Sequence, residues 1–337
     1  MPREHLHFKI VDSILPNKHS CLYQIYQTHN DYVKIGSLIH DFCYYYQFGK
    51  KRYQHFGEVL HGSGGEDTFA IIRYLLNKLT IPNSIKDVQD YRSKLIAVIM
   101  GMLSHIATDS VFHPLVFFET GNYYHNDYLQ AVKAQNRHRE FESSLDLWLL
   151  KQNLTEQINL SIFPKQVITE INLIVGGEFF DFSNWQESFG HFSIVQKLST
   201  NKNFNRLIDG LRFIPIPLIE LSSSLCVHFD RPYLSRFNEK FDYLHPVTGS
   251  KFASDVRSLM DESIELSMRY LEDLEKIVET YSLHLVDYKL HASSTDLNFE
   301  DNHYLKNNGL RFLSSSGPSL NYGMPRVHVN EARYFFE

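Results

Sequence analysis

The stretch that decides the fold reads Gly101-Met102-Leu103-Ser104-His105-Ile106-Ala107-Thr108-Asp109-Ser110-Val111-Phe112-His113-Pro114. Within it, His105, Asp109 and His113 follow one another at intervals of four residues. Residues four apart on an α-helix are separated by only about 40° around its axis, so these three side chains share one face. The segment therefore predicts a helix that carries two imidazoles and a carboxylate in a row.

The surroundings of these three side chains are apolar. From Leu95 to Phe112, apolar residues occupy nearly every face of the expected helix, as in a helix that is buried on all sides. A carboxylate and two imidazoles in such a place need partners, because unpaired polar groups are strongly disfavoured away from water. A divalent metal would satisfy all three, and the alternative is a hydrogen-bonded polar seam inside a helix bundle.

A second segment repeats the four-residue spacing. His138 and Glu142 lie in Arg137–Glu142, within an expected helix over Arg137–Leu150. Alone, this pair is weak evidence, because a His/Glu pair on a helix surface is common and contributes little. Together with the first segment it supplies a second histidine and carboxylate arm, which metal clusters held between helices require.

At these positions the chain resembles the zinc-dependent phospholipase C family. The family pattern Gly-x-x-Ser-His-x-x-x-Asp-Ser-x-x-His-Pro, followed by a His-x-x-x-Glu helix, is present in full. Upstream, the family's Gly-x-x-x-Pro-Asp is matched by Gly36–Asp41, with His40 in place of the proline. A ligand histidine at a helix entry is matched by His61, and an early histidine by His7. The resemblance covers roughly residues 1–150.

The resemblance implies a set of metal ligands and a catalytic base. One zinc would be held by Asp41, His61, His105 and Asp109, and a second by His113, His138 and Glu142. The family's third ion would use His7 and Asp109, but the tryptophan that binds it at the family's N-terminus has no counterpart, since the only tryptophans are Trp148 and Trp185. Two zinc ions are therefore expected, and a third is left open. Asp41 would also take the proton of the attacking water. His55 is the main alternative to His61, His5 is the alternative to His7, and His40 is a candidate neighbour of the ligands.

Aromatic residues follow Asp41, and they have two interpretations. The group comprises Tyr44, Tyr45, Tyr46, Phe48, Tyr53 and Phe56. They could contact acyl chains or hold a choline group by cation–π attraction, with Tyr44, Tyr45 and Phe56 as the candidate substrate-binding residues. The alternative is ordinary packing in a chain whose aromatic content is 14%.

The function that these residues predict is hydrolysis of a phosphatidylcholine-like glycerophospholipid at a membrane surface, giving diacylglycerol and a phosphorylated head group. One alternative is a zinc phosphodiesterase of the nuclease-like branch of this fold. The other is a metal-stabilised lipid-binding protein without catalysis. A net charge of −6 and the absence of a lysine-rich tract argue against duplex nucleic acid as a partner.

The N-terminus indicates where the chain is made. Met1–Leu15 carries charged residues and lacks the apolar core of a secretory signal, and Leu95–Leu103 is too short an apolar stretch to span a membrane. We therefore expect no transmembrane segment and synthesis in the cytoplasm, with any export using a route without a cleavable signal peptide. The three cysteines, Cys21, Cys43 and Cys226, are too scattered for a disulfide framework.

The periodicity of the whole chain predicts a mainly α fold, a multi-helix bundle like that of the zinc-dependent phospholipases C. Residues 1–150 would form the zinc-binding catalytic region, 151–285 a helical continuation packed on it, and 286–337 an extended or short-strand tail. Further helices are expected over Asp67–Leu79, Asp87–His113 with Pro114 as its stop, Leu154–Val175 with a break at Pro164, Asn203–Leu225 with interruptions at Pro215 and Pro217, and Asp255–Tyr281.

Overall fold

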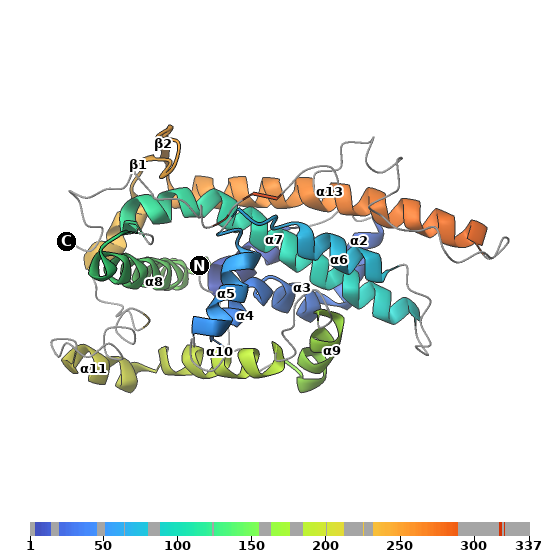
Figure 1. Ribbon diagram of the computed structural model, residues 1–337, viewed down its shortest axis with the longest axis horizontal. Helices are drawn as coiled ribbons and strands as arrows, with labels where there is room; N and C mark the ends of the chain where they lie inside the picture. The colour runs from blue at the N-terminus through green and yellow to red at the C-terminus, as the bar shows by residue number, and fades with distance from the viewer. Residues whose placement is uncertain are drawn as a thin grey trace.

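The computed structural model describes residues 4–14, 20–45, 51–63, 65–79, 88–122, 125–154, 163–175, 185–199, 201–211, 225, 232–288, 317–318 and 320. In this part of the chain, helices dominate and the strands form one short antiparallel pair (Figure 1). The mainly α fold is therefore confirmed. Most of the predicted tail, together with Tyr46, Phe48 and Cys226, lies outside the described residues.

The elements follow one another along the chain with short connections. The first helices are α1 (Glu4–Ser13), α2 (Cys21–Thr28), α3 (Asn30–Gly36), α4 (Ile39–Tyr45), α5 (Lys51–Leu60) and α6 (Ala70–Lys78). The later ones are α7 (Val88–Thr120), α8 (Tyr128–Lys151), α9 (Lys165–Val175), α10 (Trp185–Ser199), α11 (Lys202–Leu211), the 3₁₀ helix η3 (Pro232–Asn238) and α13 (Val256–Tyr288). The strands β1 (Phe241–Leu244) and β2 (Lys251–Ser254) precede α13.

Helix α7 is the central element of the fold. It runs beside α13 along the long axis of the molecule, while α3, α1, α6 and α8 pack on its other sides (Figure 1). Every residue from Leu95 to Asp109 is buried, as the apolar sequence predicts. Among the described residues α7 is the one helix long and apolar enough to cross a membrane, yet 94% of its most apolar window is buried inside the protein. This burial is what a core helix shows.

The prediction that Pro114 ends this helix is wrong. Helix α7 continues through Pro114 to Thr120. Proline in a helix interior removes one backbone hydrogen bond and is unfavourable by about 3 kcal/mol. Here Leu115, Val116 and Phe117 beyond the proline are completely buried, so packing of the extra turns outweighs the local penalty.

The strand pair also differs from expectation. Strands were predicted in the tail beyond residue 285, whereas β1 and β2 lie before α13, with Phe241 opposite Ser254 and Leu244 opposite Lys251. Each strand has only four residues, too few to show a clear alternation in the sequence. Helix α13 in turn extends to Tyr288, past the expected end at Tyr281.

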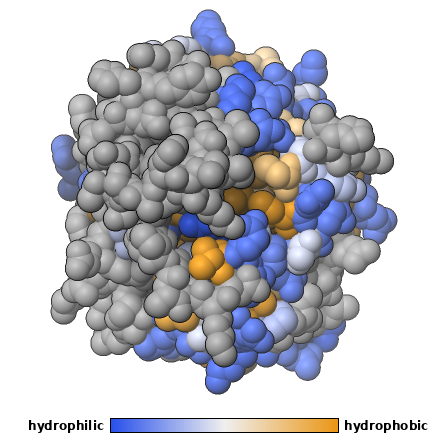
Figure 2. All heavy atoms as spheres, turned by 90° about the vertical axis from the view of Figure 1, so that its right-hand side faces the viewer, coloured by the Kyte–Doolittle hydropathy of each residue, from blue (hydrophilic) through white to orange (hydrophobic). Residues whose placement is uncertain are grey.

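Helices α9, α10 and α11 lie along one side of the molecule (Figure 1). Helix α9 begins directly after Pro164, where the sequence predicted a break, and α10 packs on α4 through Phe189 and Phe192 against Phe42. Apolar side chains from Leu6 to Leu320 belong to one continuous core. The division at residues 150 and 285 stays a prediction. At the end of the molecule seen in Figure 2, the described surface is mainly hydrophilic, with a small group of hydrophobic residues near its centre.

Two glycines allow α3 and α7 to cross with their backbones in contact. A Cβ atom added to Gly101 would lie 2.0 Å from the carbonyl oxygen of Val33 and 2.6 Å from the backbone nitrogen of Ser37. A Cβ added to Gly36 would lie 2.6 Å from the carbonyl oxygen of Val98. Neither position can hold a side chain without moving a helix. The close crossing brings the Ser37 carbonyl to the ring of His105, which lies one turn after Gly101.

We expect Gly101→Ala to destabilise the protein by about 1–3 kcal/mol or more, because the added methyl group overpacks a backbone contact. Gly190→Ala in α10 is the matched control, since a Cβ there meets nothing within 4 Å. That change should stabilise the protein by roughly 0.4–1 kcal/mol through the unfolded state. Denaturant unfolding measures both variants. Equal stability of the two would contradict the close crossing of α3 and α7.

Candidate metal centre

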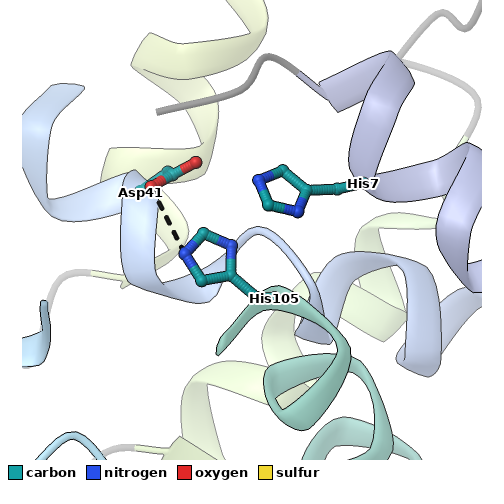
Figure 3. Close-up of side chains that lie close together, drawn as sticks. All are labelled: His7, Asp41 and His105. Carbon is teal, nitrogen blue, oxygen red and sulfur yellow. Dashed lines mark ion pairs between the residues drawn. The ribbon is translucent and has the colours of Figure 1, made fainter. Parts of the chain in front are cut away.

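Three groups of side chains that could each hold a metal ion lie along α7. Within each group the candidate ligand atoms are all within 4.8 Å of one another. The groups are His7, Asp41 and His105, then His61, His105 and Asp109, and then His113, His138 and Glu142. They comprise all eight residues predicted as ligands, and all eight are buried. Figure 3 shows the first group, in which His7 from α1, Asp41 from α4 and His105 from α7 point into one space.

Asp109 lies at the centre of the cluster. Its Oδ2 atom is 3.3 Å from Nε2 of His105, 3.3 Å from Nε2 of His113 and 3.6 Å from Nε2 of His61. Its Oδ1 atom is 3.6 Å from Nε2 of His7. Neither oxygen has a hydrogen-bond partner among the described residues. A completely buried carboxylate that faces four imidazole nitrogens at these distances needs a cation between them.

The spacing of the ligand atoms agrees with zinc. Ligand atoms that lie about 2.0–2.1 Å from a tetrahedral zinc ion are roughly 3.3–3.4 Å from one another. The Nε2 atoms of His61 and His105 are 3.4 Å apart, and Nε2 of His61 is 3.4 Å from Oδ1 of Asp41. These separations, like those around Asp109, are longer than ordinary hydrogen bonds. The residues present therefore fit a zinc site.

Three of the histidines are oriented by backbone carbonyl groups. Nδ1 of His61 lies 2.6 Å from the oxygen of Gly57, and Nδ1 of His105 lies 2.8 Å from the oxygen of Ser37. Nδ1 of His113 lies 2.6 Å from the oxygen of Leu320. A carbonyl oxygen can only accept, so each Nδ1 carries the proton and donates it. Each Nε2 therefore faces the cluster, as in metal-binding histidines whose second nitrogen is held by an outer group.

Burial favours the neutral, metal-binding form of two of these imidazoles. It lowers the pKa of His7 to about 4 and that of His113 to about 3. Burial also lowers the pKa of His61, but the carboxylates of Asp109 and Asp41 outweigh it and raise this pKa to about 9. In the metal-free protein a proton on His61 thus lies between two carboxylates, at a place that suits a metal cation.

The ring of His105 is stacked between two other imidazoles. His7 lies at a centroid distance of 4.3 Å and an angle of 18°, and His40 lies at 4.5 Å and 6°. His40 stands where the family pattern has proline, and it is completely buried. Burial, reinforced by its neighbours His105 and His61, holds the pKa of His40 well below its ordinary value. His40 thus packs against a predicted ligand without belonging to one of the three groups.

The third group is less regular than the second. Nε2 of His138 lies 2.7 Å from Oε1 of Glu142, a hydrogen-bond distance, while Nε2 of His113 is 4.0 Å from the same oxygen. His138 and Glu142 are one turn apart on α8 and face α7, as their spacing predicted. The arrangement brings the donors together, but His138 and Glu142 would have to separate slightly to bind one ion.

A residue that the sequence analysis missed, Asp146, fixes the position of α1. Its carboxylate accepts the backbone N–H groups of His5 and Leu6, each at 3.0 Å, and pairs with the His5 ring at 3.1 Å. Asp146 therefore caps the N-terminus of the helix that carries His7. It follows Glu142 by four residues, so helical phase could have revealed it. His5, the alternative to His7, is held in this cap, and the side chain of His55, the alternative to His61, lies outside the described part of the chain.

The three candidate substrate-binding residues occupy different surroundings. The Tyr44 hydroxyl is 3.5 Å from Nδ1 of His61, so this half-buried ring lies beside the cluster. The Tyr45 ring packs on Phe192 of α10 at a centroid distance of 4.6 Å. Phe56 is partly buried against the apolar core. Their role in substrate binding stays a prediction.

The comparison with protein families agrees with this geometry. The model of the family described as zinc dependent phospholipase C matches residues 5–193, more than half of the 337-residue chain. The chain belongs to the zinc-dependent phospholipase C family. The resemblance read from the central helix is thus confirmed, and it extends past residue 150 through α9 and into α10. Comparison with curated proteins and with solved structures gave no match.

Membership in the zinc-dependent phospholipase C family accounts for the chemistry of the donor set. The family is zinc-dependent, and imidazole nitrogen with carboxylate oxygen is a ligand set that zinc prefers. The matched region contains every residue of the three groups. The zinc requirement and the hydrolase class therefore follow from the family, while the number of ions and the substrate belong to the proposal below.

Proposed function

We propose that this protein is a phospholipase C that hydrolyses a phosphatidylcholine-like glycerophospholipid at a membrane surface. Water would be added across the bond between phosphorus and the glycerol oxygen, which yields diacylglycerol and a phosphorylated head group. The observation that carries the proposal is the buried carboxylate of Asp109, which faces His7, His61, His105 and His113 without a hydrogen-bond partner among the described residues. Such an arrangement suits a cluster of metal ions held close together.

The ligand sets follow from the groups along α7. We assign one zinc to Asp41, His61, His105 and Asp109, and a second to His113, His138 and Glu142, with Asp109 adjoining both. The group of His7, Asp41 and His105 leaves room for a third ion. More than one ion is proposed because a structural site is closed by four ligands, whereas here eight candidate ligands are in contact.

The reaction needs an activated water and a neutralised phosphate. Zinc, when bound, lowers the pKa of water and offsets negative charge on the phosphate oxygens. Asp41 would accept the proton of the water, since its Oδ1 faces the cluster without a hydrogen-bond partner in the described part of the chain. Burial raises the pKa of this carboxyl, but His105 and His61 lower it below its ordinary value. Asp41 is therefore ionised at neutral pH and able to accept a proton.

A metal and substrate assay on the same preparation tests the proposal. Elemental analysis should find about two zinc ions per chain, from the two ligand sets. Vesicles of phosphatidylcholine should release diacylglycerol and phosphocholine, and a chelator in excess should stop the release until zinc is restored. Other glycerophospholipids, presented in the same way, would define the head-group preference.

The same preparation distinguishes the alternatives. Cleavage of single-stranded nucleic acid without cleavage of phospholipid would favour a nuclease-like phosphodiesterase. Zinc binding without turnover of either substrate would favour a metal-stabilised lipid-binding protein. Full activity in a preparation free of transition metals would end the proposal.

A further inference from the structure

Three residues of the C-terminal region lie directly against the metal centre. These residues, Gly317, Pro318 and Leu320, are here called the tail contact. The backbone N–H of Leu320 donates to the carbonyl oxygen of His61 at 2.8 Å. Its carbonyl oxygen accepts the Nδ1 proton of His113 at 2.6 Å. A single residue thus touches two predicted ligands that come from separate parts of the fold, and the family match ends well before it, at residue 193.

The tail contact is anchored on the turn that precedes α6. The backbone N–H of Gly317 donates to Oδ1 of Asp67 at 2.6 Å, and the hydroxyl of Thr68 donates to the carbonyl oxygen of Pro318 at 2.9 Å. A Cβ atom on Gly317 would lie 2.1 Å from Oγ1 of Thr68 and 2.7 Å from the backbone nitrogen of Phe69. Glycine is therefore required for this close approach.

Leu320 makes the contact part of the core. Its side chain is completely buried and belongs to the same apolar cluster as α7. Removing an aliphatic side chain of this size from water contributes about 1.5–3 kcal/mol, which helps to hold the backbone groups of Leu320 in place. The hydrogen bonds to His61 and His113 are thus made by a fixed segment.

The consequence for the metal centre is orientation. The carbonyl oxygen of Leu320 keeps the proton of His113 on Nδ1, so Nε2 is free to face Oδ2 of Asp109 at 3.3 Å. Gly57 and Ser37 do the same for His61 and His105, but from positions close to those ligands in the fold. Outer groups of this kind change metal affinity by roughly 10–100-fold.

We propose that the tail contact is a positioning element of the metal centre, which holds His113 in the tautomer that binds metal and fixes His61 beside it. This inference rests on the proposed metal-binding function of His61 and His113. It assigns a role at the metal centre to a segment more than 100 residues beyond the end of the family match.

The test uses the full-length chain with Gly317→Val, which cannot keep the contact with Thr68 and Phe69. Zinc affinity is measured by competition with a chelator. The visible spectrum of the cobalt-loaded protein reports ligand geometry, and the ¹H–¹⁵N spectrum of the histidine rings reports which nitrogen of each ring carries its proton. We expect zinc affinity at one site to fall by roughly 10–100-fold, with a changed cobalt spectrum and a shifted ring N–H signal of His113.

Pro318→Ala is the matched control, because alanine keeps the carbonyl group that Thr68 contacts. It should leave zinc affinity and both spectra unchanged. Should Gly317→Val fail to fold, Thr68→Val removes one hydrogen bond to the tail and keeps the shape of the side chain. That variant should weaken zinc binding several-fold and shift the His113 signal in the same direction.

The outcomes separate this inference from the proposed function. A wild-type protein that binds neither zinc nor cobalt would overturn both. A wild-type protein that binds them, alongside folded Gly317→Val or Thr68→Val variants with unchanged affinity and spectra, would overturn only the role of the tail contact. A loss of thermal stability with no change in the spectra would likewise show that the contact serves folding alone.

Discussion

Replacing Asp109 by asparagine is expected to remove most of the bound zinc and to lower turnover by roughly 10³-fold or more. Asparagine keeps the shape of the side chain but not its charge, and the charge faces four imidazole nitrogens within 3.6 Å. Loss of an outer group of a metal site already weakens affinity or activity by roughly 10–100-fold, so loss of a central ligand should exceed that range. Zinc content and phospholipid turnover, measured on one preparation, check the result.

Asp90→Asn is the matched control for this prediction, because it makes the same change on the same helix. The Asp90 side chain is 41% exposed and pairs with Lys94 at 2.7 Å. An exposed pair of this kind contributes about 0–1 kcal/mol, so zinc content and turnover should stay at the wild-type level. If the Asp109 variant instead kept its full zinc content, the three groups along α7 could not share a central ligand.

The ligands on α7 and α8 could be predicted from the sequence because their signal is local. His105, Asp109 and His113 repeat every four residues inside an apolar segment, and His138 and Glu142 repeat the spacing. Helical geometry alone then places each set on one face. The positions of Asp41, His61 and His7 had no such signal, and the resemblance to the family supplied them.

The features that the sequence did not reveal depend on contacts between distant parts of the chain. Leu320 touches His113 across 207 residues, and Gly317 touches Asp67 across 250. No local pattern of residues encodes such contacts. The continuation of α7 through Pro114 has a similar origin, because packing beyond the proline overrides a local preference.

Replacing Asp41 by asparagine should separate catalysis from metal binding. Asn keeps one oxygen and the shape of the side chain, but it cannot accept a proton from water. Turnover should fall by roughly 10²–10⁴-fold, the usual effect of a positioned base. Zinc content should fall less, because His61, His105 and Asp109 remain.

Asp31→Asn, at an exposed position in the first turn of α3, is the control for this change, and neither its turnover nor its zinc content should move. A second possibility is that Asp41 only supports the start of α4. Stability would then drop by about 1 kcal/mol, as for a lost helix cap, with little change in rate. Thermal midpoint, zinc content and turnover of one sample distinguish the two. Near-normal turnover in a zinc-loaded asparagine variant would exclude Asp41 as the base and leave it as a ligand alone.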